Sequence, residues 1–438
     1  MTNSLFPGLT LTTSEFKVVP MPTHMIASFT TLESQAGTLT LRSSEANNTI
    51  CVDWNGDGSG VEYYTLGTDT ERIPVTSKAG ANAKVYTYGE KSNLIVFGLS
   101  DMKLADVDMS GLKELSMLIL ANAGINSVKW PESSFMELNL EGNNFSSIDL
   151  GTHAKDILLL NLMNNKFESF DATQFPNLGI LNLFNNQLTS VTLNSNVWQV
   201  DLGRNQLKEI DLSQATSLNL LALTENQLSH IDFSSCKNLA ALYLDRNNFK
   251  FSTLPLDAKR MGSYFTYANQ ADLEVEEVDA KVDLSSEAVI ADSLTTYRWF
   301  IGKPTVNKET YELEGEELVA DDEYKVENGV TYFNYKDGNP FVCVMTNTAL
   351  PNLTLYTAPV KVQHTVDAIT STAAESDFHV SVEGRTLCAE NGSKAEIILT
   401  DMNGRQLAKA FGSLRHTVAA PGIYLVITEK RAAKVVVK

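Results

Sequence analysis

The sequence predicts a mainly β protein: a solenoid of short, stacked coils flanked by small β-sandwich domains. Three observations carry this prediction. A pattern of the form L-x-L-x-x-N-x-L returns with a period of about 21 residues through the middle of the chain. On both sides of it, short runs of alternating β-forming residues are broken by Gly, Asn and Ser. The coils are also too short to leave much room for helices on the convex side, opposite the repeated strands.

Length and charge limit the functions that the chain can have. Its 438 residues exceed one ordinary hydrophobic core and indicate about three or four modules in a row. The net charge of −19 and the isoelectric point near 4.8 oppose binding to phosphate backbones, so we expect no nucleic-acid partner. No run approaches the roughly 18 to 20 apolar residues of a membrane span. We therefore expect no transmembrane segment.

The repeat has two fixed parts, an apolar pair and an asparagine. The apolar pairs are Leu138/Leu140, Leu160/Leu162, Leu181/Leu183, Val200/Leu202, Leu221/Leu223 and Leu242/Leu244. The asparagines are Asn143, Asn165, Asn186, Asn205, Asn226 and Asn247. Two degenerate copies come first, Phe97/Leu99 and Leu118/Leu120, with Met102 and Ala123 at the asparagine position.

This pattern resembles the leucine-rich repeat, L-x-x-L-x-L-x-x-N-x-L, over residues 94–255. The resemblance implies a solenoid of about eight coils. Alternation along each short strand points the two leucines into the coil and the residues between them outward. The asparagine amide can satisfy backbone groups that the turn after the strand would otherwise bury unpaired. On the convex side we expect extended or 3₁₀ segments.

The outward-facing residues of the concave strands form the candidate ligand-binding site. Apolar side chains recur among them, at Leu159, Met163, Ile180, Phe184 and Leu220. A polar and charged rim accompanies them, formed by Asp201, Arg204, Glu225, Tyr243 and Arg246. An apolar centre with a charged rim is typical of protein-recognition surfaces. The alternative is that a flanking loop or domain covers these residues.

The first 93 residues divide into a disordered N-terminus, 1–14, and a small β-sandwich, 15–93. The stretches 52–58 (VDWNGDG) and 85–89 (VYTYG) resemble the PKD-like (polycystic-kidney-disease) domain pattern, which implies a cap on the solenoid. Asp53, Asn55 and Asp57 also mimic the start of a calcium loop, but the twelfth position is Tyr64 where an EF-hand needs a bidentate Glu. A plain turn is favoured there, and no metal or other cofactor is expected.

Residues 264–367 again read as a β-sandwich. Trp299 and Cys343 on two predicted strands resemble the core of an immunoglobulin-like domain. The matching first strand, 281–285, contains no cysteine, so the disulfide of antibody domains cannot form there. The four cysteines of the chain fall one to each module, which indicates that structural disulfides are absent.

The last segment, 368–438, differs from the rest by a small net positive charge. It resembles the C-terminal sorting domain of the type IX (Por) secretion system of Bacteroidetes-type bacteria. The matching residues are Asp401, Gly404, Leu407, Pro421, Gly422, Tyr424, Val426, Lys434, Val436 and Lys438. Asn403-Gly404 and Pro421-Gly422 fit two tight hairpin turns. The resemblance implies that outer-membrane secretion machinery binds this domain and often removes it; the alternative is a plain β-sandwich that ends the chain.

Together these features predict a non-enzymatic binding protein that contacts a protein ligand, in adhesion or in interaction with a host or neighbouring cell. Its place would be extracellular or on the outer surface of a Gram-negative bacterium. The start, MTNSLFPGLTLTTSEF, lacks the basic and apolar regions of a signal peptide, so export implies that a leader has already been removed.

The alternative function is glycan or cell-wall binding. Asn139, Asn161 and Asn182 form an amide row on the concave strands, and Tyr243 could stack on a sugar. An enzyme is disfavoured because the sequence has no G-x-S-x-G elbow, paired acid site, phosphate loop or metal-ligand cluster.

Overall fold

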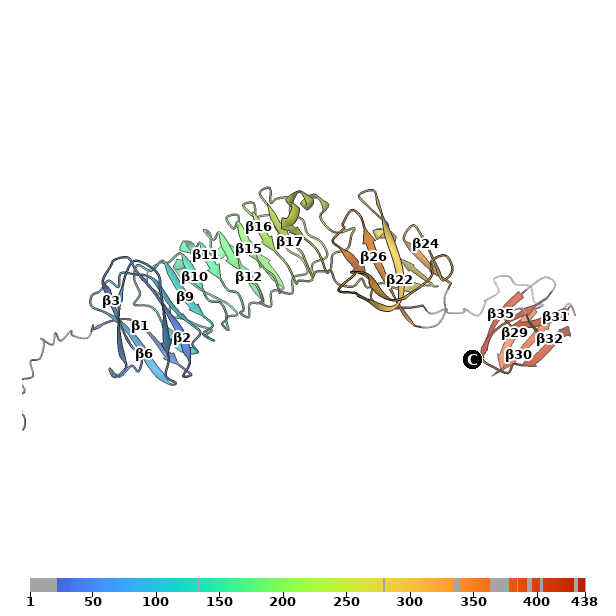
Figure 1. Cartoon of the computed structure of the whole chain (residues 1–438), viewed down its shortest axis with the longest axis horizontal. Coiled ribbons are helices and arrows are strands. Elements are labelled where there is room, and N and C mark those ends of the chain that lie inside the picture. Colours follow the sequence, from blue (N-terminus) through green and yellow to red (C-terminus); the bar gives the residue numbers. More distant parts are fainter. Residues whose placement is uncertain are drawn as a thin grey trace, which may run out of the picture. The chain divides into compact units, whose positions relative to one another are not determined.

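The structure is a computed structural model that describes residues 22–132, 134–278, 280–334, 339–362, 378–383, 385–391, 396–401, 405–428 and 432–437. The predicted disordered segment 1–14 lies outside these residues. Strands dominate the described chain, and its helical segments are 3₁₀ turns (Figure 1). In the described ranges no helix is long and apolar enough to cross a membrane. One compact unit runs to residue 275 and includes 284–318 and 342–359; the other contains 276–283, 319–341 and the chain from 360 onward.

A five-stranded antiparallel sheet of order β4-β3-β6-β1-β8 forms much of the N-terminal domain. Phe29 and Trp54 are buried beside it and meet edge to face, with ring centroids 6.1 Å apart. β8 lies beyond the predicted boundary at residue 93, because β1 needs a partner on its second edge. The strands are β1 (His24–Thr31), β3 (Asn48–Asp53), β4 (Val61–Leu66), β6 (Ala81–Thr87) and β8 (Leu104–Asp108).

An eleven-stranded sheet joins this domain to the solenoid. β5 (Glu71–Thr76) and β2 (Ala36–Ser43) run antiparallel to β7 (Leu94–Ser100), which begins the parallel ladder of the coils. Pairing with β2 covers the strand edge that the first coil would otherwise expose. The ladder continues through β9 (Met117–Ala121), β10 (Glu137–Asn139), β11 (Leu159–Asn161), β13 (Ile180–Asn182), β15 (Gln199–Asp201), β16 (Leu220–Ala222), β17 (Ala241–Tyr243) and β18 (Phe265–Thr266). This is the predicted mainly β, leucine-rich-repeat solenoid, whose short strands stack side by side in Figure 1.

Buried asparagines link each coil to the coil before it. Asn186 shows the pattern: its Nδ2 donates to the carbonyl oxygens of Leu162 and Leu183, both at 3.0 Å. Its Oδ1 accepts the amide N–H of Phe167 at 3.1 Å. Equivalent bonds to two carbonyls and one amide recur at Asn165, Asn205, Asn226 and Asn247. The prediction that these amides satisfy the turn backbone is confirmed.

The ladder runs one coil further than the repeat pattern predicts. β18 pairs in parallel with β17, and Gln270 stands where the next asparagine would be. Its Nε2 donates to Leu244 and Tyr267 carbonyls, both at 2.9 Å, and its Oε1 accepts the N–H of Asn247 and Phe249. The solenoid therefore has nine parallel strands and does not end at residue 255. The repeat pattern does not extend to this coil because Phe265 and Tyr267 stand where the other coils have their leucine pair.

The convex side carries short extended and 3₁₀ segments, as predicted. β12 (Ser169–Asp171) and β14 (Ser190–Thr192) pair in parallel. The 3₁₀ segments are η1 (Gly151–Asp156), η2 (Ala172–Gln174) and η3 (Leu256–Tyr264). In η2 the Asp171 side chain caps the first turn by accepting the Thr173 N–H at 2.9 Å.

The chain after the solenoid contains two further sheets before residue 362. The four-stranded sheet has the order β19-β20-β25-β24, and the other has β21-β22-β26-β27 with β23 paired to β22 and β28 to the start of β26. Trp299 and Cys343 are fully buried on the neighbouring strands β22 and β26, so both are core residues. The strands and the short 3₁₀ turn are β19 (Glu277–Val278), β20 (Lys281–Asp283), η4 (Ser285–Glu287), β21 (Val289–Ile290), β22 (Ser293–Val306), β23 (Leu313–Glu317), β24 (Tyr324–Glu327), β25 (Val330–Phe333), β26 (Pro340–Asn347), β27 (Thr354–Tyr356) and β28 (Val360–Lys361).

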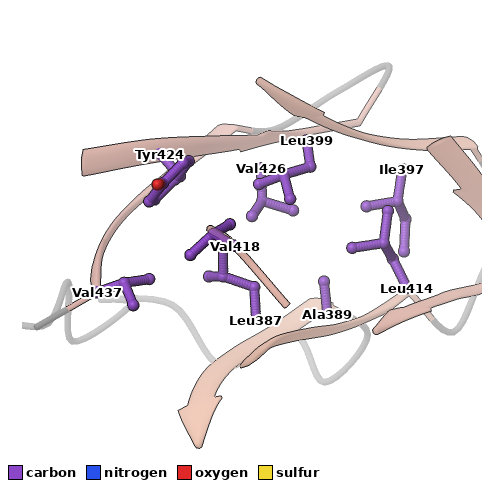
Figure 2. Close-up of a cluster of buried hydrophobic side chains, with 9 residues drawn as sticks. All are labelled: Leu387, Ala389, Ile397, Leu399, Leu414, Val418, Tyr424, Val426 and Val437. Atoms are coloured by element: carbon purple, nitrogen blue, oxygen red, sulfur yellow. The ribbon is translucent and has the colours of Figure 1, made fainter. Parts of the chain in front are cut away.

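The C-terminal segment has its own core between two sheets. One sheet consists of β29 (Phe378–Glu383), β30 (Thr386–Asn391) and β33 (Ser413–Thr417); the other has the order β32 (Gln406–Phe411), β31 (Glu396–Asp401), β34 (Gly422–Ile427) and β35 (Ala432–Val437). Figure 2 shows side chains of both sheets pointing toward one another. The buried cluster is Leu387, Ala389, Ile397, Leu399, Leu414, Val418, Tyr424, Val426 and Val437.

The two turns predicted in this segment have different outcomes. Asn403-Gly404 lies outside the described residues, and the strands on either side of it, β31 and β32, pair antiparallel. Pro421-Gly422 is not a hairpin turn: β33 belongs to the three-stranded sheet and β34 to the four-stranded sheet. The chain passes from one sheet to the other there because β33 pairs with β30, whereas β34 pairs with β31 and β35. The Tyr424 hydroxyl stabilises this crossing by donating a hydrogen bond to the Ala420 carbonyl oxygen, at 2.7 Å.

Removing one amide of the ladder should destabilise the solenoid. Asn186→Ala leaves the buried Phe167 N–H without its acceptor and removes one of the two ladder hydrogen bonds that the Leu162 and Leu183 carbonyls each accept, because Asn165 and Asn205 still donate to them. We expect this to lower the free energy of unfolding by about 1–3 kcal/mol. The matched control is Asn185→Gly, one residue away, where φ is 54° and the exposed side chain makes only a solvent-exposed hydrogen bond, to Asn164 Oδ1 at 2.6 Å. Denaturant titration should show the loss for Asn186→Ala and a change within about 0.5 kcal/mol for the control. Equal stability of the two variants would contradict the ladder's role.

Candidate binding surface

The concave strands carry their outward residues in columns, because neighbouring strands pair in register. The first column is Met117, Glu137, Leu159, Ile180, Gln199, Leu220 and Ala241. The third column is Ile119, Asn139, Asn161, Asn182, Asp201, Ala222 and Tyr243. The leucines or valine between them are buried, whereas the residues of both columns are half-buried except Ala241. The predicted alternation of inward and outward side chains is confirmed.

The five predicted apolar residues are all half-buried, but they do not form one group. Leu159 and Ile180 are register partners in the first column, and Gln199 separates them from Leu220. Met163 and Phe184 follow the third column on neighbouring coils, where the Asn164 N–H donates to the Phe184 carbonyl. Asn161 and Asn182 lie between the two pairs. The apolar surface therefore has two parts with an amide row between them.

The amide row uses its carbonyl oxygens within the protein. Asn139, Asn161 and Asn182 each accept the backbone N–H two residues ahead, at 2.9, 3.1 and 3.0 Å. The Asn161 Nδ2 also lies 3.4 Å from a Glu141 carboxylate oxygen. What the row offers a ligand is therefore mainly N–H donors.

Asp201 continues the amide row with a carboxylate. Its Oδ1 accepts the Gly203 N–H at 2.9 Å, as the asparagines do in their coils. Burial raises the pKa of this carboxyl above its usual range, and the bond from Gly203 offsets only part of that effect. The concave face thus holds a carboxylate whose charged form is poorly solvated.

Three of the five residues predicted to form the rim, Arg204, Glu225 and Arg246, are connected in a row. Glu225 accepts from Arg204 Nε at 2.9 Å and from Arg246 Nη1 at 2.5 Å. The two arginines hold the pKa of Glu225 below its usual range, with the Arg246 hydrogen bond as the largest cause. The Arg204 guanidinium lies over the Phe184 ring, 5.4 Å from its centroid. Phe184 in turn lies against Gly203, where an added Cβ would be 2.9 Å from the ring.

Tyr243 lies apart from this row, in the third column near the end of the sheet. It is half-buried between Ala222 and Thr266, its register partners on the neighbouring strands. The Thr266 hydroxyl donates to Asp245, which also accepts the Ala268 N–H at 2.9 Å.

Sequence reasoning missed a set of exposed apolar residues directly before the concave strands. Met136 and Leu158 are each 45% exposed, and Trp198 is 44% exposed. They occupy equivalent positions, because the Leu158 N–H donates to the Met136 carbonyl and Gly179 links Leu158 to Trp198 in the same way. The Trp198 indole lies over Gly179, where an added Cβ would be 2.8 Å from Nε1. The available signal was an apolar residue immediately before the repeat pattern in several coils.

The calcium-like loop of the N-terminal domain is a turn held by its own first carboxylate. Asp53 accepts the N–H groups of Gly56 and Gly58, at 2.9 and 2.8 Å. Within the described part of the chain, no group of three His, Cys, Asp or Glu side chains is placed to hold a metal ion.

Solved structures that match this chain include three proteins of Listeria monocytogenes. The functional domain of InlJ gives a TM-score of 0.35 at 16% identity and covers 58% of this chain, which spans only 64% of that domain. InlP gives a TM-score of 0.37 at 18% identity, and the match covers 58% of this chain and 76% of the InlP chain. The internalin-like protein lmo2027 gives a TM-score of 0.34 at 15% identity, and the match covers 62% of this chain and 80% of that protein's chain. No protein-family description and no curated protein sequence matches this chain.

Neutralising Asp201 should stabilise the protein near neutral pH. Asn at this position can still accept the Gly203 N–H, as in the three preceding coils, without a poorly solvated charge. Because folding raises the carboxyl pKa, the penalty is absent below the pKa of the unfolded chain, about 4, and is complete above the raised value. Melting temperatures of Asp201→Asn should exceed wild type by a few degrees at pH 7 and match it near pH 3. A higher melting temperature of Asp201→Asn at pH 3 as well would contradict the poorly solvated carboxylate as the cause.

Proposed function

We propose that this protein is a non-enzymatic binding protein, secreted or at the cell surface, that contacts a protein ligand through the concave face of its solenoid. The observation that carries the proposal is the grouping of apolar side chains on that face. Leu159 with Ile180, and Met163 with Phe184, lie on neighbouring coils. The exposed residues Leu158 and Trp198 extend this surface toward the start of the strands.

The apolar side chains of the concave face lie outside the interior of the coil. The leucine pairs and the asparagine ladder already close each coil, so none of the concave apolar residues is needed for that purpose. Exposed aromatic and aliphatic residues next to arginines are the composition of protein-binding surfaces, where a few large side chains contribute most of the affinity. The fold thus presents an apolar surface that folding alone does not explain.

Charge substitutions on this face should remove binding without unfolding. Met163→Glu and Phe184→Glu each place a carboxylate in the apolar pair that Met163 and Phe184 form, and we expect capture of the partner to fall by about tenfold or more. The assay is affinity capture from surface proteins of host or neighbouring cells, followed by mass spectrometry. The control is Ser190→Glu on the convex strand β14, which should capture as wild type does. Unchanged capture by the two concave variants would refute this contact surface.

Glycan or cell-wall binding is the second candidate function. The observation that favours it is the amide row, whose Nδ2 groups could donate to sugar hydroxyls, with Tyr243 further along the same column. A glycan array run beside the protein capture separates the two. Specific array signal that Phe184→Glu leaves intact, with no captured protein, would favour the glycan.

The C-terminal segment supports a proposal about location. A separate two-sheet core, ending in β35, is the architecture that a sorting domain needs if secretion machinery is to recognise it as a module. The proposed partner of 368–438 is the outer-membrane machinery of type IX secretion. The protein would then act outside a Gram-negative, Bacteroidetes-type bacterium.

Residues 368–438 should be sufficient to direct export. Fused behind a leader peptide and a fluorescent reporter in a Bacteroidetes-type host, they should deliver the reporter to the surface or medium, as measured on intact cells and in supernatants. Val426→Asp, which places a charge in the buried cluster, should abolish delivery. Delivery that persists in a host without the type IX translocon would contradict the sorting role.

A further inference from the structure

Each of the nine coils has a left-handed residue directly before its ladder position. In six coils this residue is one that tolerates a positive φ well: Asp101, Asn122, Gly142, Asn164, Asn185 and Asn269. Three successive coils depart from this rule. Arg204, Glu225 and Arg246 adopt φ values of 53°, 59° and 56° there.

These three residues carry a conformational cost that asparagine would avoid. An L side chain in the left-handed region clashes with its own backbone, and neither Arg nor Glu can relieve that by the local hydrogen bonds that Asn makes. Backbone strain of this kind persists where the side chain has another use. The departure from asparagine in three adjacent coils therefore needs a reason.

The ion pairs within the row are too weak to be that reason. The side chains of Arg204 and Arg246 are 51% and 58% exposed, and Glu225 is 29% exposed. Salt bridges in contact with water contribute little to stability, since solvent screens the charges and ordering the side chains costs entropy. We therefore expect Asn at these positions to give a coil at least as stable.

The row keeps hydrogen-bond donors available. Arg204 bonds Glu225 through Nε, and Arg246 does so through Nη1, so each guanidinium has further N–H groups of its five to offer. The Arg204 guanidinium carbon lies over the Phe184 ring. The nearby carboxylates are already bonded, Asp201 to the Gly203 N–H and Asp245 to Thr266 and Ala268.

We propose that Arg204 and Arg246, spaced by Glu225, form a carboxylate-binding subsite that takes an Asp or Glu side chain of the protein ligand. This inference rests on the proposed function and specifies its partner as an acidic segment with an adjacent apolar side chain for Phe184. Planar guanidinium groups match carboxylates in geometry and charge. The net charge of −19 repels an acidic partner elsewhere, so two arginines on one row direct it to this place.

Stability measurements test the strain argument directly. The variant Arg204→Asn/Arg246→Asn installs the residue found at the same position in Asn164 and Asn185. Its melting temperature should equal or exceed that of wild type. A lower melting temperature would mean that the arginines serve the fold, and it would overturn the proposal.

Binding is measured with a random copolymer of L-glutamate and L-tyrosine, immobilised on a biosensor. Wild type should bind it, and Arg204→Asn/Arg246→Asn should bind roughly tenfold more weakly or worse. The control Lys166→Asn/Lys208→Asn removes two exposed cations outside the concave columns and should bind as wild type does. Arg204→Lys/Arg246→Lys should be intermediate, because lysine keeps the charge and loses the planar donors. Raised salt should weaken wild-type binding.

No binding by wild type, or equal binding by the double Asn variant, overturns the subsite. The proposed function is judged separately, by the captured protein. If Phe184→Glu loses that protein and Arg204→Asn/Arg246→Asn keeps it, the concave face still binds the partner and only the carboxylate subsite is wrong.

Discussion

The hydrogen bonds of the buried asparagine amides are the constraint on which the rest of the solenoid depends. Each amide spans two coils, donating to carbonyls of both and accepting an N–H of the earlier one, as Asn186 does. This fixes the register of one coil on the next, because a shift would leave buried donors and acceptors unpaired. Gln270 makes the same bonds with a longer side chain, so the constraint reaches the last parallel strand.

Fixed register is what turns a repeated sequence into a surface with columns. The leucines and ladder asparagines close each coil, which leaves the first- and third-column residues, the residue two places after the third column and the turn position before the ladder to vary. Those free positions hold Ile180, Phe184 and the row from Arg204 to Arg246. The antiparallel pairing of β2 with β7 protects the first coil's edge and ties the N-terminal domain to the same sheet.

The sequence predicted the coil interior well and the concave surface in part. The leucine pairs and asparagines are determined by local periodicity, and alternation along a strand shows that Leu159 and Met163 face outward. Periodicity does not show that Asn161 and Asn182 separate the apolar residues into two pairs. It also missed Leu158 and Trp198, since the residue before a strand has no fixed direction until the coil's path is known. The left-handed conformation of Arg204, Glu225 and Arg246 is likewise invisible in a sequence.

By itself, the sequence determined the mainly β class, the solenoid and the identity of its ladder, because each depends on spacings within one or two coils. Only the tertiary structure decided the ninth coil, the strand that β1 takes from beyond residue 93, the crossing at Pro421-Gly422, and which concave side chains meet. The physical reason is common to all four. Each is settled by which strand pairs with which, and the free energy of such a pairing depends on the residues that lie on the neighbouring strand and on the opposite face.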